Sequence, residues 1–203
     1  MSRIALFSAP ALALALAACA TTQGPIEVTR FVAPAGTARL GQGTVFVESA
    51  PGSAEGLEAA PYKAAVAAEL ARLGYRESTR AGAGQLAQVR VERFVETPQG
   101  RRSPVSVGVG GSTGGYGSGV GLGVGINLGG GPRPTTGTQL SVTLRDARTG
   151  DATPNLWEGR ADIRTTDKSP LADRGRNAQA LAAALFRDFP GRSGETVQVK
   201  AGE

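Results

Sequence analysis

The chain has 203 residues, a formal net charge of +5 at pH 7, one cysteine and no histidine. Without histidine it cannot contain a Ser-His-Asp triad, a Cys-His pair or a histidine-containing zinc site. Its basic residues are scattered among acidic ones, which is typical of a solvated surface and not of a nucleic-acid groove. We therefore expect no catalytic residue, no cofactor, no metal site and no nucleic-acid partner.

Residues 1–18 have the plan of a secretory signal peptide, with Arg3 first, an apolar run next and small residues last. They end in the sequence LAAC at 16–19, which resembles the lipobox of bacterial lipoproteins. The resemblance implies cleavage before Cys19, a diacylglyceryl group on its sulfur and acylation of the new N-terminus. A single thiol in an exported protein has no disulfide partner, which also favours lipidation of Cys19 over a chance cysteine at this place.

Residues 19–25 are then a short lipidated tether, which places the folded part close to the membrane. Two or three acyl chains would hold it there, since each buried CH₂ contributes about 0.8 kcal/mol. In well-studied enterobacteria an Asp after the lipidated cysteine retains the protein in the inner membrane. Ala20 stands at that position and favours the outer membrane, facing the periplasm, with the inner membrane and the cell surface as alternatives.

The first half of the chain predicts two strands, a helix and two further strands. Short β-branched runs at 26–33 and 43–49 indicate the first two strands. Tyr62, Val66, Leu70 and Leu73 recur at helical spacing, and Gly74 stands where a helix C-terminal cap belongs. A short strand is expected at 75–79 and a longer one at 85–97.

The longer strand has an irregular pattern. Its apolar residues alternate through Val89 and Val91, but Phe94 falls on the face of Arg90 and Glu92. A β-bulge near Glu92 or Arg93 would restore the alternation, so the pattern predicts one there.

A glycine-rich segment at 103–134 interrupts the domain. In its second half aliphatic residues alternate with glycine, which makes one side of an extended strand aliphatic; these are Val120, Leu122, Val124, Ile126 and Leu128. We expect a β-hairpin or a loop excursion whose aliphatic row contacts the parent domain, an envelope protein, another copy of the chain or lipid. A mobile loop is the alternative. Arg101, Arg102 and Arg133 flank it and could hold lipid headgroups or act as solubility gatekeepers.

After this segment the chain predicts a strand, a turn and a second strand. Residues 138–146 place Leu140, Val142 and Leu144 on one face. Asp146 and Asp151 flank a turn, for which Asp and Gly are the usual residues, so a turn is favoured over a calcium site or a carboxylate pair. The strand at 155–165 returns beside the first.

Two features complete the predicted core. Trp157, near the start of the last long strand, is expected to fill the space between sheet and helix and not to stack on a sugar. Ala178, Leu181, Leu185 and Phe189 form an apolar helical stripe, which Pro190 and Gly191 end. The order of elements predicts a single α+β domain at 26–199, an antiparallel sheet with two helices packed on one face.

Several stretches resemble a known family. They are "ELARLGY", "QLAQVRVERF", "LSVTLRDARTGDATPNLWEGRA" and "ALFRDFPG". The chain is similar to the Gram-negative envelope lipoproteins grouped under domain of unknown function 4136, especially a glycine-rich branch. The resemblance implies an α+β fold and an envelope location, and it brings no established activity or catalytic residue.

Two functions fit these observations. The first is a non-enzymatic, membrane-anchored envelope lipoprotein, a scaffold or accessory that binds another envelope component. The alternative is an enzyme of the periplasmic face that acts on glycan or peptidoglycan with paired carboxylates, which would have to lie about 5 to 9 Å apart in a cleft.

Overall fold

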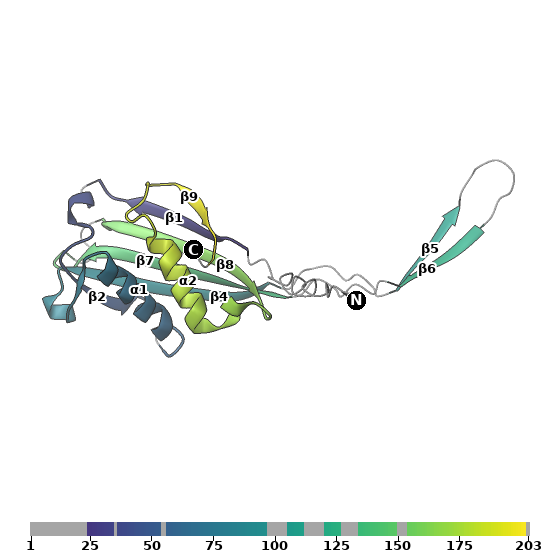
Figure 1. Cartoon of the computed structure of the whole chain (residues 1–203), viewed down its shortest axis with the longest axis horizontal. Helices are drawn as coiled ribbons and strands as arrows, with labels where there is room; N and C mark the ends of the chain where they lie inside the picture. The colour runs from purple at the N-terminus through teal and green to yellow at the C-terminus, as the bar shows by residue number, and fades with distance from the viewer. Residues whose placement is uncertain are drawn as a thin grey trace, which may run out of the picture.

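The computed structural model describes residues 24–34, 36–53, 56–96, 105–111, 120–126, 134–149 and 154–201. Seven strands form one sheet in the order β3-β2-β4-β7-β8-β1-β9, and β5 (Val105–Gly111) and β6 (Val120–Ile126) form a separate pair (Figure 1). The expected signal peptide, Cys19, most of the tether and much of the segment 103–134 lie outside the described residues.

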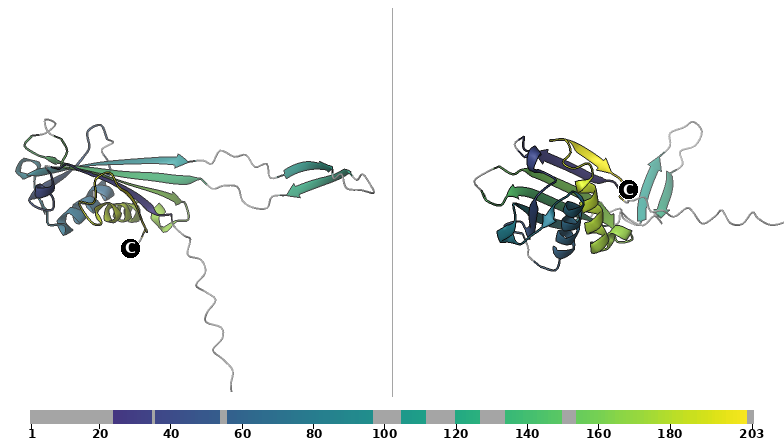
Figure 2. Two further views of the ribbon diagram at one scale, coloured as in Figure 1. Left: turned by 90° about the horizontal axis from the view of Figure 1, so that it is seen from above. Right: turned by 60° about the vertical axis from the view of Figure 1, so that its left-hand side comes forward.

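The large sheet is covered on one face by two helices. Its strands are β1 (Ile26–Val32), β2 (Thr44–Ser49), β3 (Arg76–Glu77), β4 (Gln85–Glu96), β7 (Thr135–Asp146), β8 (Trp157–Thr166) and β9 (Thr196–Val199). The helices are α1 (Ala60–Arg72) and α2 (Arg174–Phe186), and short 3₁₀ turns are η1 (Thr37–Arg39), η2 (Arg80–Gly82) and η4 (Pro170–Ala172). Figure 2 shows both helices on the same side of the sheet, which confirms the predicted α+β class.

The sheet is mixed, not wholly antiparallel. Neighbouring strands from β4 through β7, β8 and β1 to β9 are antiparallel, as predicted. However, β2 runs parallel to both β3 and β4. The reason is the connection: α1 returns the chain across the sheet before β3 and β4, as crossovers between parallel strands do. The prediction is therefore wrong for the β2 side of the sheet.

The core lies between the sheet and the helices. Alternate strand residues point toward α1 and α2, and Tyr62, Val66 and Leu70 of α1 are fully buried. From α2, Ala178, Leu181 and Leu185 are fully buried as well. The buried strand residues include Ile26, Val28, Val45, Ala87, Val89, Leu140, Val142, Leu144, Ala161 and Ile163. The predicted helical stripes and the inward strand residues of β7 are thus confirmed.

Trp157 is the largest fully buried side chain. Its ring stacks on Phe186 with centroids 5.4 Å apart and lies 5.3 Å from Phe189. Its indole N–H donates to the Pro190 carbonyl at 2.9 Å, which satisfies the one polar atom that burial would otherwise leave unpaired. The predicted core role of Trp157 is confirmed.

The two helix ends differ from one another. Gly74 has φ +102 and donates to Ala71, while the N–H of Tyr75 donates to the carbonyl of Leu70. This is a Schellman motif, and it confirms the predicted cap. In contrast, α2 ends at Phe186, so Phe189 lies beyond the helix in which it was predicted, although it still packs against the core.

The bulge predicted near Glu92 or Arg93 is absent from β4. The pairing of β4 with β7 is continuous from Gln85 opposite Asp146 to Glu96 opposite Thr135. Phe94 therefore does lie on the polar face, directly opposite Gly137. A Cβ at Gly137 would come within 2.3 Å of the Phe94 ring, so the aromatic side chain occupies the space that this glycine leaves. A glycine on the neighbouring strand, not a bulge, accommodates Phe94.

Candidate functional site

The residues predicted for a partner surface belong to β6. Val120, Leu122, Val124 and Ile126 lie within this strand, whereas Leu128 lies outside the described residues, as do Arg101, Arg102 and Arg133. The register places Val105 opposite Ile126, Val107 opposite Val124 and Val109 opposite Leu122. Gly108 and Gly110 of β5 stand opposite Gly123 and Gly121 of β6. Three aliphatic pairs thus alternate with glycine pairs, while Ser106 stands opposite Gly125 and Val120 opposite Gly111.

A second surface, which the sequence did not single out, is the open face of the large sheet, defined as the face opposite α1 and α2. No described helix covers it. Cross-strand pairing brings together Thr29 and Phe31 of β1, Glu158 and Arg160 of β8, and Ser141 and Thr143 of β7. These side chains line a groove of about 340 Å³ whose floor is the backbone of Val142 and Gly159.

The groove combines an aromatic ring with unengaged polar groups. Phe31 is 53% exposed. Thr29 shares a hydrogen bond with Thr196, and Glu158 accepts one from Asn155. In contrast, the side chains of three further groove residues have no hydrogen bond or ion pair within the part of the chain that the structure describes: Ser141, Thr143 and Arg160. Such a surface can recognise a partner through an aromatic contact, hydroxyl groups and a guanidinium.

The groove lacks the parts of a nucleophilic site. A serine or threonine hydroxyl needs an adjacent base to become a nucleophile. Histidine does not occur in the sequence. Among groove residues Glu158 is the one carboxylate, and it is held by the amide of Asn155. Within the described residues, no serine or threonine hydroxyl of the groove is hydrogen-bonded to a base.

The sequence contained the signal for this face. In β8, inward Trp157, Gly159, Ala161 and Ile163 alternate with outward Glu158, Arg160, Asp162 and Arg164. This period-two pattern predicts one buried and one solvated face. What it could not supply is the neighbour of each residue, because the pairing of β1 with β8 joins segments far apart in the chain.

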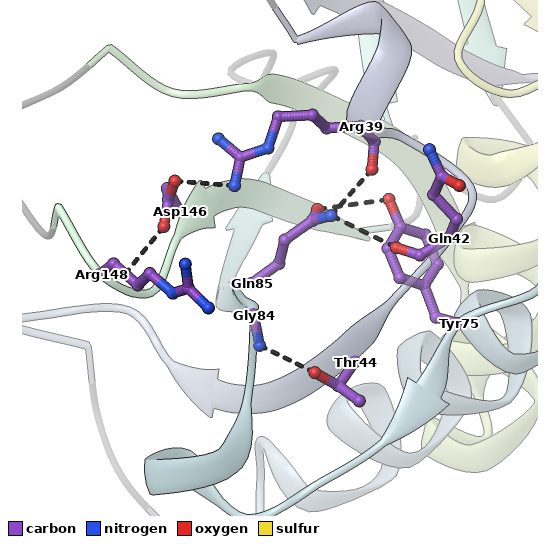
Figure 3. A network of polar contacts seen from close by, with 8 residues as sticks. All are labelled: Arg39, Gln42, Thr44, Tyr75, Gly84, Gln85, Asp146 and Arg148. Carbon is purple, nitrogen blue, oxygen red and sulfur yellow. Dashed lines mark hydrogen bonds and ion pairs between the residues drawn. The ribbon is translucent and has the colours of Figure 1, made fainter.

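A polar cluster occupies the other end of the sheet, where β2 and β4 begin (Figure 3). Gln85 is buried, and its amide donates to the carbonyls of Arg39 at 2.8 Å and Gln42 at 3.4 Å. The Tyr75 hydroxyl donates to the Gln85 side-chain oxygen at 3.4 Å and accepts from the Gly41 N–H at 2.9 Å. Burial raises the pKa of the Tyr75 phenol, more than the Gly41 hydrogen bond lowers it, so this hydroxyl stays protonated.

Asp146 ties the β7–β8 turn to the same cluster. It accepts from the Arg148 N–H at 2.8 Å and forms an ion pair with Arg39 at 2.7 Å (Figure 3). The Arg148 N–H and the Arg39 guanidinium hold the pKa of the Asp146 carboxyl below its usual range. Asp151 lies outside the described residues. The cluster fixes loops to the sheet, and the predicted turn role of Asp146 is confirmed.

Glu48 is a second carboxylate with a shifted pKa. Burial acts to raise it, but hydrogen bonds from Arg80 at 2.8 Å and Gln88 at 3.1 Å, with the charges of Arg80 and Arg145, outweigh burial and lower it. A general acid of a glycosidase needs a raised pKa. The lowered pKa values of Glu48 and Asp146 suit carboxylates that bind arginine, not proton donors.

Arg30 is a buried charge that sequence reasoning missed. Its guanidinium donates to the carbonyls of Leu185 at 2.9 Å and Ala184 at 3.0 Å, at the C-terminal end of α2. Burial lowers its pKa, although Asp188 and Glu195 oppose this effect. Cations are favoured at helix C-termini because unpaired carbonyls give this end a negative partial charge. Arg30 therefore caps α2, and the adjoining groove of about 590 Å³ is a consequence of this packing.

The described part of the chain has neither a candidate metal site nor a candidate membrane-spanning helix. The described residues contain no group of three or more metal-ligating side chains. No helix in the same part of the chain combines the length and hydropathy needed to cross a membrane.

Comparisons with known proteins add a family and one fold likeness. The sequence profile of the "Domain of unknown function (DUF4136)" matches residues 42–191. No curated protein matches the chain. Among solved structures, a PDZ domain protein from Parabacteroides distasonis ATCC 8503 is similar, with 13% sequence identity and a TM-score of 0.47. The alignment covers 87% of this chain but 39% of that one, so the chain spans well under half the length of that protein.

Proposed function

The chain belongs to the DUF4136 family, and from this premise we propose that it is a non-enzymatic lipoprotein of the bacterial envelope. Lipid on Cys19 would hold it in the outer membrane, facing the periplasm, where it acts as a scaffold or accessory for another envelope component. The lipobox at 16–19 supports the anchor. The first strand begins at Ile26, so residues 20–25 alone would separate the sheet from the lipidated cysteine.

One observation carries the binding role, which is the uncovered and unengaged groove on the open face. A partner that docks there would bury the half-exposed ring of Phe31 and supply hydrogen bonds to Ser141, Thr143 and Arg160. Aromatic residues and arginine are enriched among residues that dominate binding energy at protein interfaces. The groove thus offers the side chains that interface centres use.

The anchor is tested by fractionation in a Gram-negative host. Wild type and Cys19→Ser are expressed in parallel, with palmitate labelling and separation of outer and inner membranes. We expect the wild type to incorporate palmitate and to sediment with the outer membrane, while Cys19→Ser does neither. A wild-type protein that takes up no palmitate and fractionates like Cys19→Ser would remove the anchor from the proposal.

The binding surface is tested by photo-crosslinking in the same cells. A photoreactive residue replaces Phe31 in the groove or, as a matched control, Arg72, which lies on the outer side of α1 with its side chain 72% exposed. We expect a discrete adduct from position 31 that Arg160→Glu reduces several-fold, and none from position 72. Equal adducts at both positions, or an adduct at 31 that Arg160→Glu leaves unchanged, would contradict a role for the open face.

A further inference from the structure

The start of β1 and the connection that carries β5 and β6 meet at one end of the large sheet. Glu96 at the end of β4 pairs with Thr135 at the start of β7, which pairs in turn with Thr166 at the end of β8. β1 is antiparallel to β8, and Ile26 lies beside the last part of β8. We call this the tether end. The chain that leads back to Cys19 and the glycine-rich segment therefore leave the sheet on the same side.

The tether end also gathers exposed apolar side chains. Within the described residues four large hydrophobic side chains are exposed: Phe31, Leu57, Phe94 and Val95, at 53, 90, 43 and 70%. Phe94 and Val95 are among the last three residues of β4, at this end. Leu57 precedes Glu58, whose carboxylate pairs with Arg174 at the start of α2, just after β8. Phe94 and Val95 thus lie at the tether end, Leu57 lies before α1 close to the start of α2, and Phe31 lies in the groove.

Charges at the tether end are largely balanced. Glu96 pairs with Arg164 at 3.1 Å, and Glu58 pairs with Arg174 at the same distance. Asp167 and Lys168 are neighbours in the turn after β8. Among the described residues of this end, apolar contact would therefore dominate association with a membrane. Attraction of anionic headgroups to Arg101, Arg102 and Arg133, which flank the glycine-rich segment outside the described residues, would add to it.

The two strands β5 and β6 extend this apolar character. Neither contains a charged residue. Because alternate residues of a strand share a face, the register gathers seven aliphatic positions into one row; these are Val105, Val107, Val109, Val120, Leu122, Val124 and Ile126. Ser106 and glycine residues occupy the other row. One face of the pair is therefore apolar in sequence and the other nearly without side chains.

The size of the pair limits how it can meet lipid. Each strand has seven residues and spans about 23 Å. A two-stranded pair has two edges with unpaired backbone groups, which cannot be satisfied inside hydrocarbon. At the membrane interface, headgroups and water can pair with these edges while an apolar row contacts the acyl chains.

We propose that the tether end faces the membrane and that the aliphatic row of β5 and β6 lies on the lipid surface, as a second contact beside the anchor. This proposal rests on lipidation of Cys19. Lipid is the expected contact of the row because the tether to Cys19 and the uncharged strands both leave this end of the sheet, where exposed apolar residues also lie. The groove around Phe31 and the polar cluster around Gln85 then lie away from the lipid.

The experiment uses the full-length lipidated protein in vesicles of phosphatidylethanolamine and phosphatidylglycerol. Cys19 is the only cysteine, so when its sulfur carries lipid a newly introduced cysteine is the single reactive thiol. Val107→Cys reports the aliphatic row, Ser106→Cys the other row of the same strand, and Arg148→Cys the opposite end of the sheet. Each is labelled with an environment-sensitive fluorophore, and a spin-labelled lipid serves as quencher.

We expect a blue shift and several-fold stronger lipid quenching at position 107 than at 106, and none at 148. Equal emission and quenching at 106 and 107 in vesicle-bound protein would overturn the proposal. A blue shift at position 107 that increases with protein density, without quenching by the spin-labelled lipid, would assign the row to contact with a second copy of the chain. A protein without an introduced cysteine that still reacts with the fluorophore has a free Cys19 thiol, which overturns the anchor itself.

Discussion

The two faces of the large sheet come from the same strands and have opposite roles. On the covered face, residues such as Leu140 and Val142 are fully buried against α1 and α2. On the open face, the side chains of Ser141 and Thr143, from the same strand, form no hydrogen bond with another described residue. The covered face therefore fixes stability, whereas residues of the open face are free to be chosen for binding. Substitutions on the two faces should separate these roles.

The largest effect is expected on the covered face at Trp157. Trp157→Ala removes a ring that packs on Phe186 and Phe189 and leaves the Pro190 carbonyl without its donor. Replacing a buried tryptophan by alanine costs about 3–5 kcal/mol. Urea unfolding of the chain from residue 20 onward measures it, and a loss below about 1 kcal/mol would mean that this face is not the core.

Two glycines in adjacent strands give a matched pair across the sheet. In Gly159→Ala the new Cβ would lie 2.3 Å from the Trp157 ring and 2.8 Å from Leu185, so overpacking should cost about 1–3 kcal/mol. In Gly137→Ala the new Cβ meets the ring of Phe94, which is half exposed and can turn toward solvent. We expect a smaller loss there by the same unfolding measurement. Equal losses would contradict the difference between the faces.

The contact between the helices comes next. The Tyr62 hydroxyl donates to the side-chain oxygen of Asn177 at 3.0 Å, and both residues are buried. Tyr62→Phe leaves that oxygen unsatisfied, which costs about 1–3 kcal/mol. Asn177 also donates to the Leu171 carbonyl at 3.1 Å, so the single variant Asn177→Leu is the reference for the double variant Tyr62→Phe with Asn177→Leu. The two single losses should sum to more than the loss of the double variant, and additive losses would assign the effect of Tyr62→Phe to packing.

Asp146→Asn should have a smaller, pH-dependent effect. The folded pKa of Asp146 is lowered, so its contribution is complete above the ordinary aspartate pKa of about 3.9 and is lost as pH falls through the folded value. Arg39 is partly exposed, so we expect about 0.5–1 kcal/mol at neutral pH. The Tm difference from wild type should shrink on acidification below about pH 4. Asp167→Asn, at an exposed turn, is the control, and a difference that grows on acidification would refute the assignment.

The smallest effect on stability is expected at Arg160. Its side chain lies on the open face with no hydrogen bond or ion pair to another described residue, so Arg160→Ala should change the free energy of unfolding by less than about 0.5 kcal/mol. Thermal unfolding gives the comparison. A loss of more than about 1 kcal/mol would show that the groove supports the fold, and reduced crosslinking at Arg160 variants could no longer be read as lost binding.

Residues with local signals were predicted well. The spacing of Tyr62, Val66 and Leu70 located α1, and Gly74 located its end, because helix periodicity and caps depend on residues a few positions apart. The turn at Asp146 and the core position of Trp157 were likewise readable from neighbours in sequence.

Features that depend on distant partners were not predictable. The parallel pairing of β2 with β4 depends on where α1 returns the chain. β9 has four residues, which is too short for a recognisable strand pattern in the sequence. Arg30 reads as a polar interruption of β1 until α2 brings its terminal carbonyls to it. Phe94 called for a bulge until Gly137 was known to lie opposite. The groove on the open face was not predicted for the same reason, because its residues come from three separate strands.

The position of β1 between β8 and β9 has a consequence for the order in which the fold can form. β1 pairs with β8 and β9, and Ile26 lies opposite Val199. Contacts so distant along the chain form late, because the entropy of closing the intervening loop is lost before any pairing compensates for it. A chain shortened before β8 would leave β1 without both partners. The growing polypeptide therefore keeps β1 unpaired until β8 and β9 have been synthesised.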